Sequence, residues 1–177
     1  MSTIDLIILG LLCQSPKSAY DLQKQIETRN LSRWVKVGSF TVYKKVSLYE
    51  TKGYVTSQTI KNGKMPEKTI YTITQSGKDV FKELMSKFSL SETRVFLDFN
   101  AVIVNLSLLD NDSIMEYVTN IRNSIQTTKA QISEQLSKQK SLSLFGQTIL
   151  EQQFILLKAL EDWENNFERQ LLKERNK

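Results

Sequence analysis

The apolar pattern of this chain changes its period once within the first 75 residues, and that change restricts the fold more than any other feature. Residues 3–13 repeat apolar side chains at helical spacing, and Ser2 with Asp5 predicts a capping box at their start. Ser18 with Asp21 is a second capping-box pair, which opens another segment of the same kind. A third helical pattern starts near Ser39 or Thr41 and ends at Gly53. The beginning of the chain therefore predicts three short helices.

Two alternating segments follow these helices. Residues 54–60 and 69–74 are rich in Val, Thr and Ile, as strands are, and Asn62-Gly63 between them is a strong signal for a tight turn. Three short helices followed by a β-hairpin is the order of a winged helix-turn-helix. We therefore expect a mainly α fold with a small β-hairpin, in which residues 1–88 form an N-terminal winged helix-turn-helix.

The remaining residues, 89–177, are helical in pattern. Residues 111–138 and 146–175 form two long amphipathic segments whose apolar stripes are too wide for one small body to bury. We expect these two helices to pack on each other and on a second copy of the chain. The sequence thus predicts a C-terminal helical dimerisation domain, with contacts from Ile114, Val118, Ile121, Ile125, Leu156, Leu160, Trp163 and Phe167.

Charge is divided unevenly between the two halves. Residues 1–90 contain 14 Lys and Arg against 7 Asp and Glu, a net charge of +7. Residues 91–177 contain 10 against 12, a net charge of −2. A basic half beside a mildly acidic one favours a polyanion such as nucleic acid as the partner of the first half. The alternative is that a basic protein distributes its charge in this way without a nucleic-acid partner.

Several classes of site are excluded by residue type. Histidine is absent and Cys13 is the single cysteine, which rules out a disulfide within the chain, a Cys/His zinc site and a histidine base. The acidic pairs Asp110/Asp112 and Glu161/Asp162 resemble helix caps and solvated-face residues rather than metal ligands or an acid–base pair. We therefore expect no enzyme activity, no cofactor and no metal.

Membrane contact is not expected either. No apolar run approaches the roughly 20 residues that cross a bilayer, and the first residues lack the basic segment of a signal peptide. The expected location is the cytoplasm.

The third predicted helix offers a surface for the major groove of DNA, because a helix fits that groove and its first turns reach base edges. Val42, Val46 and Tyr49 share its apolar side. The expected DNA contacts on the other sides are Ser39, Phe40, Thr41, Tyr43, Lys44 and Lys45. The alternative is an ordinary solvated helix face, on which Thr and Lys are common.

The tip of the predicted hairpin is basic. Lys61, Asn62, Lys64 and Lys68 surround its turn, and lysines on a protruding ribbon suit phosphate or minor-groove contacts. Lysines also keep strand edges from pairing with other chains. The two roles are compatible.

Four short motifs stand in order along residues 4–85. They are residues 8–12 (Ile-Leu-Gly-Leu-Leu), residues 20–22 (Tyr-Asp-Leu), Tyr43 with residues 50–55 (Glu-Thr-Lys-Gly-Tyr-Val), and residues 71–77 (Tyr-Thr-Ile-Thr-Gln-Ser-Gly). As a set they resemble the first helix, the Gly-Tyr signature, the recognition helix and the closing strand of the PadR family of bacterial transcriptional regulators. Residues 158–163 resemble, more loosely, the last helix of the longer family members.

This resemblance implies a homodimer that binds a pseudo-palindromic double-stranded operator, typically as a repressor, and releases it on a small-molecule or other signal. It also implies that Tyr20, Tyr43 and Tyr71 contact phosphates or the groove, the alternative being aromatic packing around a small core. The chain departs from the family pattern where Lys44 replaces a proline and Ala19 a glycine. The basic wing residues are all lysine rather than arginine, which favours backbone contact over guanine recognition.

An effector pocket between the two halves is a further candidate site. Its candidate lining residues are Trp34, Phe88, Phe96, Phe99 and Phe154. Aromatic side chains at helical spacing also form cores, which is the alternative interpretation. Cys13 ends an apolar helix, so we expect a buried thiol rather than a redox sensor.

Two functions from different classes remain. The first is a homodimeric winged-helix repressor, which the lysines of the third helix and the hairpin favour. The second is a protein-interaction adaptor, in which the same wing and helices bind a protein partner instead of an operator. The all-lysine wing and Phe40 on the third helix leave the adaptor open.

Overall fold

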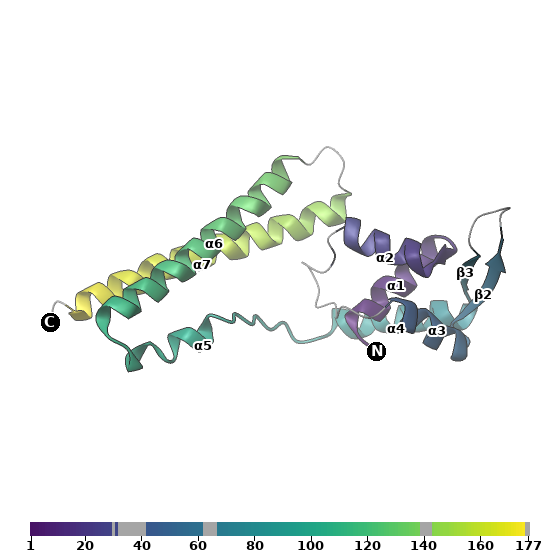
Figure 1. The fold of residues 1–177 in the computed structure, drawn as a ribbon, viewed down its shortest axis with the longest axis horizontal. Helices are drawn as coiled ribbons and strands as arrows, with labels where there is room; N and C mark the ends of the chain where they lie inside the picture. The colour runs from purple at the N-terminus through teal and green to yellow at the C-terminus, as the bar shows by residue number, and fades with distance from the viewer. Residues whose placement is uncertain (30, 32–41, 62–66, 139–142, 176–177) are drawn as a thin grey trace. The chain divides into compact units, whose positions relative to one another are not determined.

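The computed structural model describes residues 1–29, 31, 42–61, 67–138 and 143–175. The chain consists of two compact units, unit 1 (Met1–Thr93) and unit 2 (Arg94–Lys177), shown in Figure 1. None of the helices in the described part of the chain is both long and apolar enough to span a membrane.

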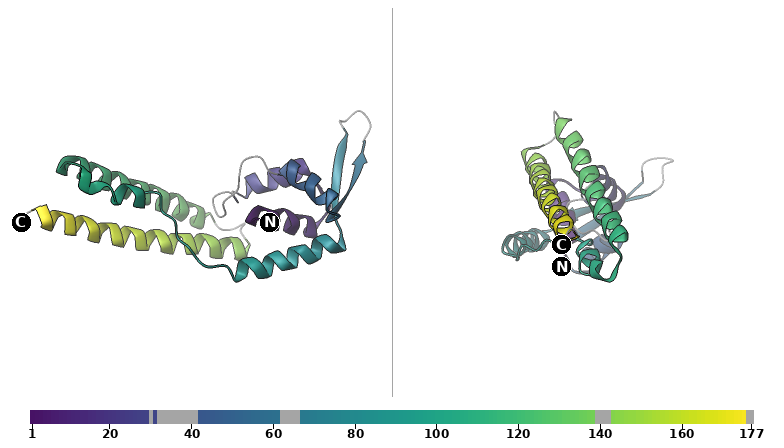
Figure 2. Two further views of the ribbon diagram at one scale, coloured as in Figure 1. Left: turned by 90° about the horizontal axis from the view of Figure 1, so that it is seen from below. Right: turned by 90° about the vertical axis from the view of Figure 1, so that its left-hand side faces the viewer.

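Unit 1 holds helices around a small sheet, in the order expected for a winged helix-turn-helix. Its elements are α1 (Thr3–Gln14), β1 (Lys17–Ser18), α2 (Ala19–Thr28), α3 (Val42–Thr51), β2 (Val55–Ile60), β3 (Lys68–Ile73) and α4 (Gln75–Ser89). Strands β2 and β3 pair antiparallel and extend away from the helices as a wing (Figure 2). The predicted mainly α fold with a β-hairpin is confirmed.

The sheet has a third strand that the sequence pattern did not predict. β1 pairs antiparallel with the outer side of β3, with Lys17 opposite Tyr71 and Ser18 opposite Ile70, and gives the order β1-β3-β2. Two residues are too few to show an alternating pattern. This short strand ties the start of α2 to the base of the wing.

The first two helices begin at capping boxes, which confirms the local signals in the sequence. The carboxylate of Asp5 accepts a hydrogen bond from the backbone N–H of Ser2 at the start of α1. The carboxylate of Asp21 accepts from Ser18 in the same way, and the Ser18 hydroxyl accepts from the backbone N–H of Asp21 at 3.2 Å. Helix α1 ends at Gln14, just before Pro16, which cannot donate a backbone hydrogen bond.

The core of unit 1 is formed by the inward-facing sides of its helices. Its buried apolar residues are Ile4, Ile8, Leu9, Leu11, Leu12, Ala19, Leu22, Ile26, Val42, Val46, Tyr49, Val55 and Leu84. The predicted inward side of the third helix, Val42, Val46 and Tyr49, is therefore confirmed. Phe88 is half-buried against this core.

Glycine is needed at two points where the wing joins the helices. Gly53 has a φ of 72°, a left-handed conformation that turns the chain from α3 into β2. Gly77 lies in the first turn of α4, where a Cβ atom would stand 2.1 Å from the carbonyl oxygen of Tyr54. That carbonyl also accepts a hydrogen bond from the N–H of Thr74, whose hydroxyl caps α4.

Unit 2 is a pair of long helices with a short helical segment before them. Its elements are α5 (Asn100–Ile103), a 3₁₀ turn (Leu106–Leu108), α6 (Asn111–Ser137) and α7 (Leu144–Arg175). Helices α6 and α7 lie side by side along most of their length, as both Figure 1 and Figure 2 show. Asp110 caps α6 by accepting from the N–H of Ser113, as its predicted capping role requires.

The apolar seam of α6 is used inside the chain. Val118, Ile121 and Ile125 are buried within a single copy of unit 2, and Ile114 is half-buried. The sequence predicts that these four residues contact a second chain. The structure corrects that assignment for the three buried residues, because α7 already covers the seam.

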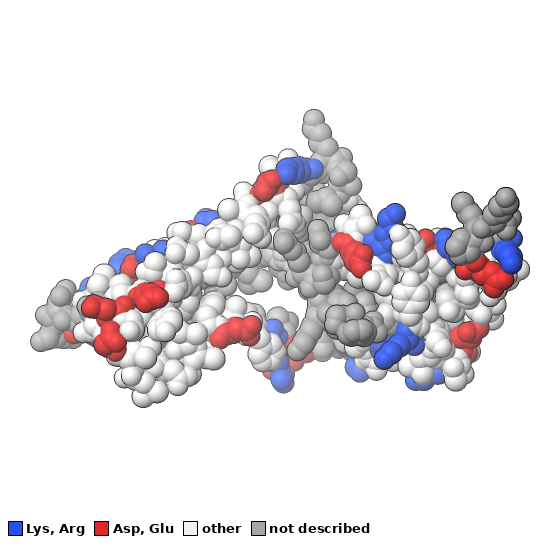
Figure 3. All heavy atoms as spheres, in the orientation of Figure 1, with Lys and Arg blue, Asp and Glu red and all other residues white. Residues whose placement is uncertain are grey.

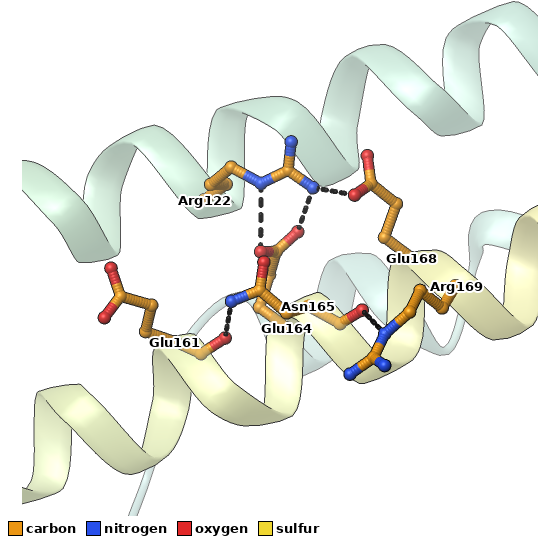
Figure 4. A network of polar contacts seen from close by, with 6 residues as sticks. All are labelled: Arg122, Glu161, Glu164, Asn165, Glu168 and Arg169. Carbon is orange, nitrogen blue, oxygen red and sulfur yellow. Dashed lines mark hydrogen bonds and ion pairs between the residues drawn. The ribbon is translucent and has the colours of Figure 1, made fainter.

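A polar network joins α6 to α7 (Figure 4). The guanidinium of Arg122 donates two hydrogen bonds of 3.0 Å to Glu164, whose side chain is only 1% exposed, and also pairs with Glu168. Lys129 pairs with the half-buried Glu161. Glu161 is thus an interhelical partner, not the solvated-face residue that the sequence suggested.

The close approach at Gly77 gives a direct test of how α4 joins the wing. We expect Gly77→Ala to destabilise the protein by about 2–3 kcal/mol, because the methyl group would force the Tyr54 backbone away. Denaturant unfolding measures this change. Gly10→Ala is the control, since its Cβ would meet only the ring edge of Phe81 at 3.2 Å, and it should lie within about 1 kcal/mol of wild type. Equal stability of Gly77→Ala and wild type would contradict the packing described.

Candidate DNA-binding surface

Three tyrosines from different elements of unit 1 line one hollow. Tyr20 comes from the first turn of α2, Tyr43 from the first turn of α3, and Tyr71 from the wing strand β3. The rest of the lining is Ser18, Ala19, Glu67, Lys68 and Thr69. The structure therefore brings together the three tyrosines that the family resemblance pointed to, and adds Lys68 from the predicted wing.

The pairing of β1 with β3 explains why these side chains meet. It places the residues just before Tyr20 against the wing, because Ser18 lies opposite Ile70 and Lys17 opposite Tyr71. Tyr20 and Tyr43 remain 61% and 57% exposed, so they are not core residues. Tyr71 is half-buried and packs against the core of unit 1.

The chemistry of the hollow suits an anionic ligand. Partial burial, together with the negative charge of Glu50, raises the pKa of Tyr71, so its hydroxyl stays protonated and can donate. Hydroxyl groups and an ammonium group are typical donors to phosphate oxygens. The lining thus carries three tyrosine hydroxyls and the Lys68 ammonium as donors, beside one carboxylate, that of Glu67.

Two adjacent lysines of α3 have different surroundings. Lys44 is exposed, and within the described residues its amine has no ion-pair partner. Lys45 is 24% exposed and its Nζ lies 2.7 Å from Oδ1 of Asp5 on α1. Adjacent helical residues point about 100° apart, so one lysine faces outward and the next faces the body of unit 1. Tyr43 and Lys44 are therefore the predicted DNA contacts that lie on the exposed side of α3 in the described structure.

Asp5 is the buried partner in this arrangement, with a side chain only 1% exposed. Burial by itself raises the pKa of its carboxyl, but hydrogen bonds from Lys45, Tyr49 and Ser2 outweigh this and lower the pKa to about 2. The Tyr49 hydroxyl donates to the same oxygen that pairs with Lys45. The sequence predicts only a capping role for Asp5 and does not show its contacts with α3. A lone acid within an apolar helix was the available signal.

The wing lysines in the described structure also have acidic neighbours. Lys68 Nζ lies 2.9 Å from Asp21 Oδ2, and Lys61 Nζ lies 3.6 Å from Glu67 Oε1. Both pairs are exposed, and exposed pairs contribute only about 0–1 kcal/mol. Among the described residues on the face shown in Figure 3, basic and acidic atoms are interspersed over unit 1.

Some predicted site residues lie outside the described residues. They are Trp34, Ser39, Phe40, Thr41, Asn62 and Lys64. Their roles stay predictions.

The described effector candidates are distributed over both units. Phe88 packs on the core of unit 1, whereas Phe96 in unit 2 is 82% exposed and Phe154 is half-buried. Phe99 stacks on Trp163 with ring centroids 5.6 Å apart, and Trp163 stacks in turn on Phe167 at 5.7 Å. Phe88 therefore has a core role, and Phe99 belongs to an aromatic stack within unit 2.

Two observations concern other kinds of site. Cys13 is exposed, which corrects the predicted buried thiol, because the buried side of α1 ends with Leu11 and Leu12 and the next side chain points away from it. Desolvation raises the pKa of its thiol, against the smaller opposing effect of Lys78. Among the described residues, no three Cys, Asp or Glu side chains come together as metal ligands.

Comparison with known proteins connects this surface to a family. Residues 8–83 match the model of the transcriptional regulator PadR-like family. Among curated proteins, no sequence matches the chain.

Similar solved structures cover nearly the whole chain. Bacillus subtilis PadR in complex with operator DNA is 20% identical, covers 95% of this chain and 98% of its own, and has a TM-score of 0.80. The same protein in complex with p-coumaric acid is 18% identical, with the same coverage and a TM-score of 0.77. The Vibrio cholerae virulence activator AphA is 17% identical over 98% of both chains, with a TM-score of 0.70. Residues 8–83 therefore carry the sequence pattern of the PadR-like transcriptional regulators, and the whole chain has the fold of these solved structures.

Proposed function

We propose that this protein is a homodimeric repressor that binds a pseudo-palindromic operator in the cytoplasm and releases it on a small-molecule or other signal. The observation that carries the proposal is the hollow lined by Tyr20, Tyr43, Tyr71 and Lys68. It joins both helices of the helix-turn-helix to the wing, and its donors suit the phosphate backbone. The B. subtilis relative in complex with operator DNA supports the same assignment.

The proposed DNA contacts follow from exposure and charge. Lys44 is a groove or phosphate contact because its amine is exposed, and Lys61 and Lys68 become phosphate contacts when DNA replaces their weak acidic partners. We exclude Lys45 from this set because its amine is held by Asp5. Ser39, Phe40, Thr41, Asn62 and Lys64 complete the proposed surface on sequence grounds.

The proposed dimer contact lies on α7. The large exposed apolar side chains of α7 are Leu144, Phe145, Ile155, Leu156, Trp163 and Leu172. Because a helix advances about 100° per residue, the first five share one side of α7 and Leu172 lies off it. An exposed apolar side of this length is typical of a protein–protein interface. Leu160 and Phe167 are half-buried beside it, and Ile114 is the half-buried residue among the four predicted contacts on α6.

The proposed effector is an aromatic small molecule. The relative in complex with p-coumaric acid shows that a protein of this fold takes such a ligand. In this chain, the stacked rings of Phe99, Trp163 and Phe167 with the exposed Phe96 offer aromatic surface in unit 2. Trp34 and Phe154 remain further candidates from the sequence.

The adaptor is the second candidate, favoured by one observation. Asp21 and Glu67 partly neutralise the described wing lysines, which weakens the attraction of the wing for DNA. Activation is an alternative to repression, since one structural relative is called a virulence activator.

Binding to its own upstream DNA tests the proposed function. We expect fluorescence anisotropy to give a Kd of about 10 nM or tighter for this DNA, at least about 1000-fold preference over a scrambled duplex, and a steep salt dependence. Equal and weak binding to both duplexes would favour the adaptor. A reporter placed behind the bound DNA then separates repression from activation.

The two neighbouring lysines of α3 test the assigned DNA-facing side. We expect Lys44→Ala to reduce the slope of log affinity against log salt by about 1 per protomer, because one phosphate contact is lost. Lys45→Ala should leave the slope unchanged and instead lower the free energy of unfolding by about 2 kcal/mol, because it leaves Asp5 without its cation. The opposite pattern would show that the helix presents a different side.

The dimer contact on α7 is tested by a charge on its exposed apolar side. Ile155 is 65% exposed, so Ile155→Glu should leave helix content and melting unchanged but weaken dimerisation by about 100-fold or more in sedimentation equilibrium. Asn123→Glu is the control, because Asn123 is exposed on α6, away from its buried seam. A fully dimeric Ile155→Glu protein would rule out this side of α7 as the interface.

A further inference from the structure

The recognition helix α3 is attached to α1 through a single buried carboxylate. Asp5 accepts from the Ser2 backbone at the start of α1, and its Oδ1 atom receives both the ammonium of Lys45 at 2.7 Å and the hydroxyl of Tyr49. Lys45 and Tyr49 are four residues apart and therefore neighbours on one side of α3. Two points of α3 are thus held by one atom of α1.

We propose that Asp5 is a positioning residue for DNA recognition, which sets the rotation and the height of α3 through Lys45 and Tyr49 and so aims the outward side chains of the helix. The proposal rests on the DNA-binding role proposed above. Asp5 itself is buried and touches no DNA in this scheme.

Asp5 can fix the orientation of α3 because its charged contacts are directional, whereas the apolar contacts beneath the helix are not. Val42 and Val46 fill the core beneath α3, but dispersion contacts are non-directional and tolerate a small rotation or slide of the helix. Charge-assisted hydrogen bonds are short and directional. A rotation that kept the apolar packing would still break the contacts of Asp5, so these contacts select one orientation of α3.

The contacts around Asp5 keep its carboxyl group ionised. The low pKa of Asp5 keeps its carboxylate charged at any physiological pH, so the attachment is permanent and does not act as a pH switch. Buried ion pairs often add little net stability compared with an apolar pair, and some instead specify a unique arrangement. Specifying the orientation of α3 is the corresponding role here.

Asp21 provides a matched control within the same unit. It occupies the same position in its own capping box and also pairs with a lysine of a DNA-contacting element, Lys68 on β3. The difference is burial, because the Asp21 side chain is 36% exposed and the Asp5 side chain 1%. The exposed pair is easily replaced by solvent or phosphate and should not hold the wing in place.

The test measures specificity separately from overall binding. The probes are a duplex that the wild-type protein selects from a random library and a scrambled duplex of equal length. For Asp5→Asn we expect the ratio of specific to non-specific affinity to fall by about 10-fold or more, the effect of losing one base contact, with an unchanged salt slope. For Asp21→Asn we expect both affinities to stay level or rise together, with the ratio within about threefold of wild type.

A double variant separates positioning from simple stability. Asp5→Asn leaves the Lys45 ammonium without its partner, and adding Lys45→Met removes that charge while keeping the length of the side chain. We expect Asp5→Asn/Lys45→Met to recover melting temperature but not specificity, with binding measured well below the melting temperature of each variant. A double variant with wild-type specificity, or an Asp5→Asn protein whose two affinities fall equally, would overturn the proposal. Failure of the wild-type protein to select any duplex would instead overturn the proposed function.

Discussion

The contacts of the Asp5 carboxylate are the interactions on which the arrangement of unit 1 depends. Placing a charge among Ile4, Ile8 and the other apolar residues of α1 carries a large desolvation cost, which only several strong donors can offset. Those donors come from the start of α1 and from α3, so the same contacts that make the buried charge tolerable also join the two helices. The outward side of α3 is defined as a consequence.

Unit 2 also contains a buried carboxylate that joins two helices. Glu164 is buried between α6 and α7 and is satisfied by Arg122, which also reaches Glu168. These contacts register the two helices against each other, while the apolar seam of α6 supplies the area of contact. The exposed apolar side of α7 lies outside this packing and is the contact that we propose for a second chain.

Local signals in the sequence predicted most of the elements. The two capping boxes, the wing and the inward side of α3 were all visible, because each depends on residues within a few positions of one another. The strand β1 was not visible, since two residues carry no period and exist as a strand only where β3 lies beside them. The apolar seam of α6 and its packing on α7 were also expected, but the sequence did not show that this packing buries Val118, Ile121 and Ile125 within one chain.

The sequence by itself determined the order of helices and strands, the residue types present and therefore the exclusion of histidine, disulfide and Cys/His zinc chemistry. The tertiary structure decided which charges are free. Lys44 and Lys45 are equivalent in sequence, yet one is exposed and the other is held by Asp5, forty residues away along the chain. An ion pair depends on distance in space, which composition and spacing do not encode, whereas a helix cap depends on neighbours that the sequence displays directly.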